Sequence, residues 1–553
     1  MIKIQLVIAG IFLMICTDVA YGATYTVGHD MNYDYQSITD ALDAGIVVAG
    51  DILLVADGTY NATDPNYPET FPLVMKEGVT LKREWSGIVP VIDAEDTARV
   101  FYCDNIGAGP SETRIEGFKI TGGMCNVYSS SGGGLHLIDT ILTLADCTIV
   151  GNSSNYHGGG IGLDYSSPNL INCTINGNSA IFDCAGLYCD HYSSPILTNC
   201  TITGNSASGN GGGLHCDYRS SPILTNCTIT GNSAKTGGGL YCRFLSSPTL
   251  RTCTITGNAS SFAYGGGIFC DRSSPTLSNC TITFNSAHSD GGGLYCRNRS
   301  SPIFINGTIA YNSAENFGGG LCFILSSPML INCTIIGNSA NSDGGGLRCY
   351  NSSPILTNCT FTGNSTDTFG GGLYCEGHLT LPILTNCILW NDTPNEIHVH
   401  SGAPEVTYCD VQQGYAGEGN IDCDPFLSID WHLTACSCCI DAGTNTGAPL
   451  DDFDGQTRPN PDTNIVDIGA DEYYGITQTP TEIPCINNGD VTLDGEITTG
   501  DSLLAFLIVL LSYSPTFEEA CAADCNGDEE ITVGDAQLIF QTVQGYGNCV
   551  DPL

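Results

Sequence analysis

Short apolar stretches alternate with turn residues along the middle of the chain and recur at a nearly fixed spacing. Threonine and isoleucine alternate in stretches such as 228–230, the pattern of a half-buried strand, and helical periodicity is missing there. Each unit has the approximate sequence SSPILTNCTITGNSA, then a variable segment, then GGGLYC. Three short strands per unit cannot bury a core alone, so the pattern predicts a parallel β-solenoid of stacked coils. One proline marks each unit, at steps of 26 to 28 residues: Pro168, Pro195, Pro222, Pro248, Pro275, Pro302, Pro328, Pro354 and Pro382.

Asparagine recurs at two turns of the unit, where stacked amides can satisfy backbone groups that a sheet leaves unpaired. The first turn holds Asn199, Asn226, Asn279, Asn306, Asn332, Asn358 and Asn386, and the second, after glycine, holds Asn178, Asn205, Asn232, Asn258, Asn338 and Asn364. Over residues 101–410 these units resemble right-handed parallel β-helix repeats of the pectin-lyase-like kind. The resemblance implies an all-β fold, of a class that also contains polysaccharide-degrading enzymes.

The segments on either side of the repeats look like caps. Residues 23–100 begin with an amphipathic stretch, Ser37–Leu42, followed by an apolar one, Asp51–Val55, which predicts a helix and a strand covering the first coil. Residues 411–475 include DFDG at 452–455 and DIGADE at 467–472, and they resemble the closing segment of bacterial surface-anchored β-helix proteins.

Residues 1–22 have the pattern of a secretory signal, with Lys3 before an apolar stretch and small residues before Ala23. Export permits disulfides, and the chain has 30 cysteines. Lysine and arginine total 16 against 58 acidic residues, a net charge of −42, which argues against nucleic acid as a partner. No segment of the mature chain has the roughly 18 apolar residues of a membrane helix.

Most of the cysteines form two columns that alternate in phase with apolar residues, so both should point inward. Gly307 and Phe323 replace cysteine in the two columns of the same unit, which suggests direct contact between the columns. The pairs expected on this basis are Cys173–Cys189, Cys200–Cys216, Cys227–Cys242, Cys253–Cys270, Cys280–Cys296, Cys333–Cys349 and Cys359–Cys375. They could be disulfides or packed thiols, and metal binding is a third interpretation.

The residue between leucine and cysteine in GGGLYC should face outward. Adjacent coils lie about 4.8 Å apart, so these side chains would stack into a strip. The strip predicts either a polysaccharide-binding surface or a ladder that only stabilises the fold. Its members are Tyr188, His215, Tyr241, Phe269 and Tyr295.

The next column begins with Asp164, Asp190, Asp217 and Arg243. Successive carboxylates at this spacing fit a glycosidase pair or an oxygen site for Ca²⁺, and with Arg243 they are similar in residue type to the Ca²⁺-and-arginine arrangement of pectate lyases. The alternative is a salt-bridged face, because Asp271 and Arg297 continue the column with alternating charge. The coils lack the Asp-Asp pair and Gly-His-Gly of polygalacturonases, so catalysis stays undecided.

The C-terminal segment differs in composition from the repeats. Residues 476–484 form a Thr/Pro linker, and 485–553 contain two acidic loops with oxygen donors at calcium-ligand spacing and a central glycine. With an apolar stretch after each loop, the segment resembles a dockerin, which implies a small α-helical calcium-loop domain and a cohesin-type or cell-surface partner. The expected Ca²⁺ ligands are Asp490, Thr492, Asp494, Glu496, Thr498, Asp501, Asp524, Asn526, Asp528, Glu530, Thr532 and Asp535.

The sequence therefore predicts a secreted extracellular β-helix protein tethered through a calcium-binding dockerin-like module. Its solenoid would serve as a scaffold or as a polysaccharide-binding surface. One alternative is a polysaccharide lyase or glycoside hydrolase that acts on an acidic plant- or algal-type polysaccharide. Another is a structural surface adhesin. The glycan and the cohesin partner stay open at this point.

Overall fold

The computed structural model describes residues 22–85, 87–107, 109–127 and 130–474. The expected signal sequence, apart from its last residue, and the expected linker and calcium loops lie outside the described residues. The chain divides into two compact units. Among the described residues, the first comprises those from 22 to 303, Ile309–Ser327 and Ser339–Asn341, and the second comprises Phe304–Thr308, Pro328–Asn338 and 342–474.

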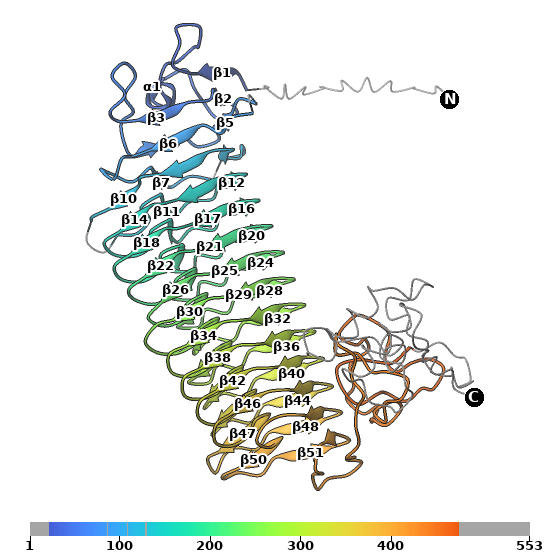
Figure 1. The fold of residues 1–553 in the computed structure, drawn as a ribbon. Coiled ribbons are helices and arrows are strands. Elements are labelled where there is room, and N and C mark those ends of the chain that lie inside the picture. The colour runs from blue at the N-terminus through green and yellow to red at the C-terminus, as the bar shows by residue number, and fades with distance from the viewer. Residues whose placement is uncertain (1–21, 86, 108, 128–129, 475–553) are drawn as a thin grey trace, which may run out of the picture. The chain divides into compact units, whose positions relative to one another are not determined.

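Each coil of the first unit contributes one strand to each of several parallel sheets. One coil consists of β24 (Ile223–Thr225), β25 (Thr228–Thr230), β26 (Ser233–Ala234) and β27 (Leu240–Arg243). The next supplies β28 (Thr249–Arg251), β29 (Thr254–Thr256), β30 (Ala259–Ser260) and β31 (Ile268–Asp271), each parallel to its counterpart (Figure 1). The predicted parallel β-solenoid is confirmed. Each coil has four strands instead of the expected three. The additional strand, Ser-Ala, has only two residues and is too short to be recognised in the sequence pattern.

The coils of the second unit have the same strand order within each coil. Its coils include β44 (Ile355–Thr357) and β45 (Thr360–Thr362), which pair in parallel with β48 (Ile383–Thr385) and β49 (Ile388–Trp390). The helix and strand expected near the N-terminus are present as α1 (Ile38–Asp43) and β2 (Ile52–Val55), and the Ser37 side chain caps α1. No helix among the described residues is long and apolar enough to cross a membrane.

Buried side chains stack in the same order in successive coils. Leu224, Cys227 and Ile229 are at most 1% exposed. The expected asparagine ladder lies beside them, since Asn205 Nδ2 donates to Asn232 Oδ1 at 2.9 Å and Asn232 Nδ2 donates to the next amide. The ladder therefore supplies partners for polar groups that the short strands leave inside the core.

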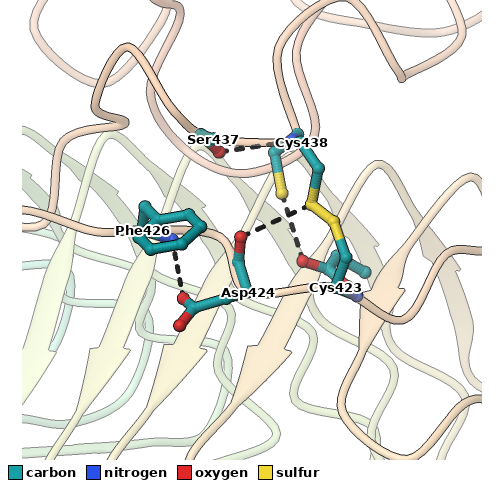
Figure 2. Close-up of a disulfide and its surroundings, with 7 residues drawn as sticks. Cys423, Asp424, Phe426, Ser437 and Cys438 are labelled. Carbon is teal, nitrogen blue, oxygen red and sulfur yellow. Dashed lines mark hydrogen bonds between the residues drawn. A yellow bond between two sulfur atoms is a disulfide. The ribbon is translucent and has the colours of Figure 1, made fainter.

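The cysteines point inward as expected, but the predicted cross-column pairs, from Cys173–Cys189 to Cys359–Cys375, are wrong. All of these cysteines are buried and none is in a disulfide, as the packed-thiol alternative expected. In-register parallel pairing places each thiol against its own counterpart in the next coil: Cys216 pairs with Cys242 along the strands, and its thiol contacts those of Cys189 and Cys242. The described disulfide joins Cys423 to Cys438, outside both columns, with a Cα separation of 6.5 Å (Figure 2).

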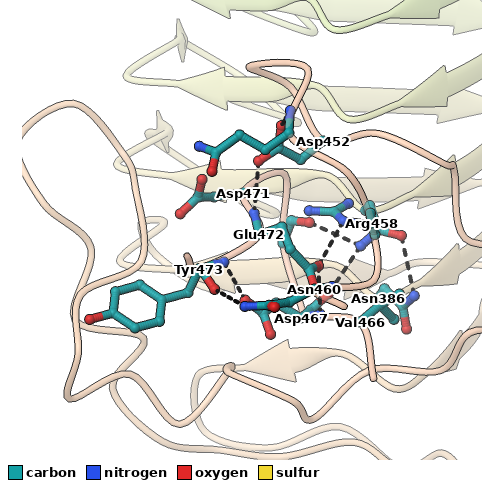
Figure 3. Close-up of polar contacts among 12 residues, drawn as sticks. Asn386, Asp452, Arg458, Asn460, Val466, Asp467, Asp471, Glu472 and Tyr473 are labelled. Carbon is teal, nitrogen blue, oxygen red and sulfur yellow. Dashed lines mark hydrogen bonds and ion pairs between the residues drawn. The ribbon is translucent and has the colours of Figure 1, made fainter. Parts of the chain in front are cut away.

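In the second unit, residues after 411 pack against the side of the coils through a buried polar cluster. Arg458 is 1% exposed. Its Nε donates to Glu472 Oε2, its Nη1 to Asn332 Oδ1 and its Nη2 to the Ala470 carbonyl, each at 3.0 Å (Figure 3). Because Asn332 belongs to the repeats, this arginine joins the C-terminal segment directly to a coil.

Candidate functional site

The expected aromatic strip is buried, so it cannot serve as an exposed sugar platform. Tyr188 and Tyr241 are 6% exposed and His215 is fully buried; Phe269 and Tyr295 are similar. The prediction of an exposed surface is wrong because the variable segment before the triple glycine folds over these rings. Tyr264, from that segment, stacks on Tyr295 with ring centroids 4.5 Å apart.

The rings do stack with one another, as the alternative interpretation expected. Tyr241 and Phe269 lie 4.7 Å apart at an interplanar angle of 4°, and Tyr295 follows at 5.5 Å from Phe269. Burial lowers the pKa of His215 to about 4, so its imidazole is neutral under ordinary conditions. The row is a ladder that stabilises the fold.

The predicted aspartate column is brought together, with each carboxylate against a basic side chain. Asp217 is fully buried and accepts from Arg243 Nε at 2.8 Å and Nη2 at 2.6 Å. Asp164 and Asp190 both contact His191 instead. Burial raises the pKa of Asp190. These contacts correspond to the salt-bridged interpretation of the column.

Sequence reasoning missed the turn that follows this column. An aromatic residue directly follows the column residue in four consecutive coils: Tyr165, His191, Tyr218 and Phe244. Ser-Ser comes immediately after Tyr165 and one residue later in the other three coils. Their rings stack from coil to coil with centroids 5.2, 5.2 and 5.1 Å apart. Each has a φ between 40° and 51°, a left-handed conformation that bulky side chains rarely adopt. Such backbone strain tends to persist at functional sites.

This turn forms a groove of about 520 Å³ on the surface of the first unit. Arg219 Nη1 donates to Tyr192 Oη at 3.3 Å, and the Arg272 guanidinium lies 5.5 Å from the centre of the Phe244 ring. The groove therefore combines apolar ring edges with fixed positive charge. Its lining residues are His191, Tyr192, Tyr218, Arg219, Phe244, Leu245 and Arg272.

Positive charge is concentrated at this turn in a strongly acidic protein. Five of the eleven arginines of the chain occur here or at the adjoining strand ends: Arg219, Arg243, Arg272, Arg297 and Arg299. Three of them pair with aspartates: Arg243 binds Asp217, and both Arg272 and Arg297 contact Asp271, at 3.4 and 3.0 Å. Arg219 makes no ion pair with a carboxylate of the described residues and is available to a ligand.

A second cluster in the C-terminal segment has the residue types of a metal site. His432 Nδ1 lies 3.3 Å from Asp454 Oδ2 and 3.1 Å from Asp471 Oδ1. These three groups could hold a cation, but the same contacts satisfy a protonated histidine, and the neighbouring carboxylates raise its pKa despite burial. The calcium ligands expected at 490–501 and 524–535 lie beyond the described residues.

Comparison with known proteins concerns mainly the fold. Three overlapping stretches, residues 104–241, 198–289 and 239–411, match the family described as the right handed beta helix region. Similar solved structures include pectate lyase Pel9A (12% identity, 82% of this chain and 97% of that one, TM-score 0.28) and XylC in complex with xylose (10%, 81% and 98%, 0.32). At these values neither structure supports an argument about function. None of the curated proteins matches the sequence.

Proposed function

Since this chain belongs to the right-handed β-helix family, we propose that it is an extracellular polysaccharide-binding protein, tethered by a calcium-binding dockerin-like tail. The fold alone does not determine a function, so the proposal depends on the residues at the surface of this protein. The observation that carries it is the groove of exposed rings and arginines at the turn after β19 (Leu187–Asp190), β23 (Leu214–Cys216), β27 and β31.

The groove suits a long, repeating ligand better than a small one. It crosses consecutive coils, which are about 4.8 Å apart, so it offers similar contacts at regular intervals along the stack. Ring edges can pack against the apolar faces of sugars, and guanidinium groups can donate to hydroxyl or carboxylate oxygens. A glycan that lies along the stack would therefore meet aromatic and cationic groups in turn.

The charge distribution supports binding of glycans that carry some acidic groups. The net charge of −42 would repel a polyanion from most of the surface. Within the groove, Arg219 has no carboxylate partner among the described residues, and Arg272 shares Asp271 with Arg297, so positive charge is in excess there. An acidic glycan would therefore be attracted to this place and repelled elsewhere.

Retention on a panel of immobilised polysaccharides, neutral and uronic-acid-rich, tests the proposal. We expect the mature protein to bind at least one member and Tyr218→Ala to weaken that binding about tenfold, the loss of one good ring contact. Phe284→Ala is the matched control, because Phe284 stacks on Tyr311 at 5.2 Å and is exposed at a different turn. Equal losses from both variants, or no binding by the parent protein, would contradict the proposal.

A further inference from the structure

One of the two cysteine columns lies at the turn before β13 (Thr148–Val150), β25 and their counterparts in other coils, and we call it the turn column. Gly307 divides it into two unbroken runs with one cysteine per coil. Its thiols are reduced in the structure and at most 3% exposed. The first run has six members and the second has four: Cys147, Cys173, Cys200, Cys227, Cys253 and Cys280, then Cys333, Cys359, Cys387 and Cys409.

Backbone hydrogen bonds along the stack fix the spacing of these cysteines. The Cys173 carbonyl accepts from the N–H of Thr201, and the Cys200 carbonyl accepts from that of Thr228, each at 2.9 Å. The same bond, at the same length, is present at every cysteine that is followed by another in its run. Successive cysteines are therefore in register, with Cα atoms about 4.8 Å apart. This spacing lies within the Cα separations of disulfides, about 4.4 to 6.8 Å.

The thiols also lie against one another along the column. Cys200 Sγ donates to the carbonyl of Leu170, in the preceding coil, at 3.4 Å, and Cys227 Sγ donates to that of Leu197, in its own preceding coil, at 3.6 Å. The Cys200 thiol contacts those of Cys173 and Cys227 on its two sides. Because a thiol is a weak donor, little is lost when these bonds give way to a covalent link.

The lengths of the two runs leave one way to pair every thiol. In a row where each thiol reaches only its two neighbours, full pairing needs an even number of members and must begin with the first two. Runs of six and four meet this condition. The other column has five cysteines from Cys189 to Cys296, then Phe323, then Cys349 and Cys375, so pairing of neighbours would leave one of its thiols over.

We propose that the turn column is oxidised in the exported protein to five disulfides that join neighbouring coils. The secretory pattern of residues 1–22 predicts a compartment that permits disulfides. Each linkage would join two coils that otherwise depend on contacts between neighbours. The inference is independent of the proposed glycan groove. The pairs are Cys147–Cys173, Cys200–Cys227, Cys253–Cys280, Cys333–Cys359 and Cys387–Cys409.

The oxidant is a disulfide, either of a small molecule or of a thiol–disulfide oxidoreductase, and atoms and electrons balance. The first cysteine loses its proton, and its thiolate attacks one sulfur of the oxidant, whose other sulfur leaves with the electron pair of the broken bond. The neighbouring cysteine, deprotonated in turn, attacks the sulfur of the first and displaces the remaining oxidant sulfur. The two protons end on the two oxidant sulfurs, so one disulfide is formed in the protein and one is reduced.

The linkages form while the coils stack, before the thiols are fully packed. Only a thiolate attacks a disulfide, and burial raises the pKa of Cys147 to about 11, so a packed thiol reacts slowly. The same burial then shields a completed disulfide from reductants.

Disulfide mapping by mass spectrometry tests the proposal on the full mature chain, exported by a bacterial host. The protein is unfolded in an alkylating reagent without reduction and is then digested with pepsin, whose acid pH stops disulfide exchange. We expect peptides linked through the five pairs. The cysteines of the turn column should be alkylated only after reduction.

Variants that change the number of thiols in a run sharpen the test. Cys173→Ala should make Cys147 the one newly alkylated member of the column and leave Cys200–Cys227 in place. Adding Cys147→Ala should abolish that new signal, because the run is even again. Cys103→Ala is the control, since the residue paired with Cys103 in the next coil is Leu137, and it should preserve all five pairs.

Three results would overturn the inference. The first is alkylation of the whole turn column without reduction, which would leave it as packed thiols. The second is linkage in the other phase, such as Cys173–Cys200, and the third is linkage between the columns, such as Cys200–Cys216. Retention on polysaccharides is measured separately, so its failure would contradict the proposed function alone.

Discussion

Replacing Asn232 by alanine is expected to destabilise one coil locally. Asn232 Oδ1 accepts from the backbone N–H of Asn205 at 3.0 Å, and its Nδ2 donates to the Ile202 carbonyl at 2.9 Å. Asn232 is 1% exposed, so water does not readily replace these bonds. The substitution leaves a backbone donor and a backbone acceptor unpaired in the core.

The size of the effect follows from those two groups. A buried polar group without a partner costs about 1–3 kcal/mol, so two of them should cost about 2–6 kcal/mol. Repeat proteins are stabilised mainly by neighbouring units, so the loss should be confined to the adjacent coils. Amides of β21 (Thr201–Thr203) and β25 should lose most of their protection, and those of α1 should lose none.

Hydrogen exchange measured by mass spectrometry gives the opening free energy of each segment. Asn226→Gly is the control. Asn226 belongs to the other, more exposed ladder, where its Nδ2 donates to Asn199 Oδ1 at 2.7 Å. Glycine readily adopts the positive φ of this position. We expect this control to cost about 1 kcal/mol or less. Similar exchange in both variants would refute the reasoning that the buried ladder stabilises the coils.

Three further predictions concern the C-terminal half. Arg458→Met should leave Glu472 buried without its partner and cost about 3–5 kcal/mol, seen as earlier proteolysis after residue 411. Burial raises the pKa of Glu396, beside Asp392, from 4.5 to about 7, so the folded state holds a proton that the unfolded chain has released. Thermal stability should therefore fall between these two pH values, and Glu396→Gln should flatten that part of the profile. The tail should bind two Ca²⁺ by calorimetry, and Asp494→Ala should remove one.

The fold could be predicted because every coil places the same residue type at the same position. Alternation along Leu-x-Cys correctly separated inward from outward side chains, and Asn232 was recognised as a ladder residue. The predicted partner of each cysteine was wrong, because alternation indicates the direction of a side chain but not which side chain lies next to it. The burial of Tyr241 was missed for a related reason: the segment that covers it has no repeated pattern.

The candidate site was harder to predict than the fold. The aspartates were selected because carboxylates have an evident chemistry, while the adjacent Tyr218 and Phe244 looked like irregular turn residues. Large aromatic side chains are not expected at positive φ, where asparagine or glycine is usual. The signal available in the sequence was the succession of rings and arginines just before Ser-Ser in consecutive units.

The central claim is that a glycan lies in the groove of the first unit, and arginine footprinting tests it most directly. The full protein is treated with a dicarbonyl reagent with and without a polysaccharide that it retains, and each arginine is quantified by mass spectrometry. The account predicts that the glycan protects Arg219 and Arg272 and leaves the exposed Arg251, on another sheet, unprotected. Protection of Arg251 alone, or equal modification of all three with and without the glycan, would contradict it.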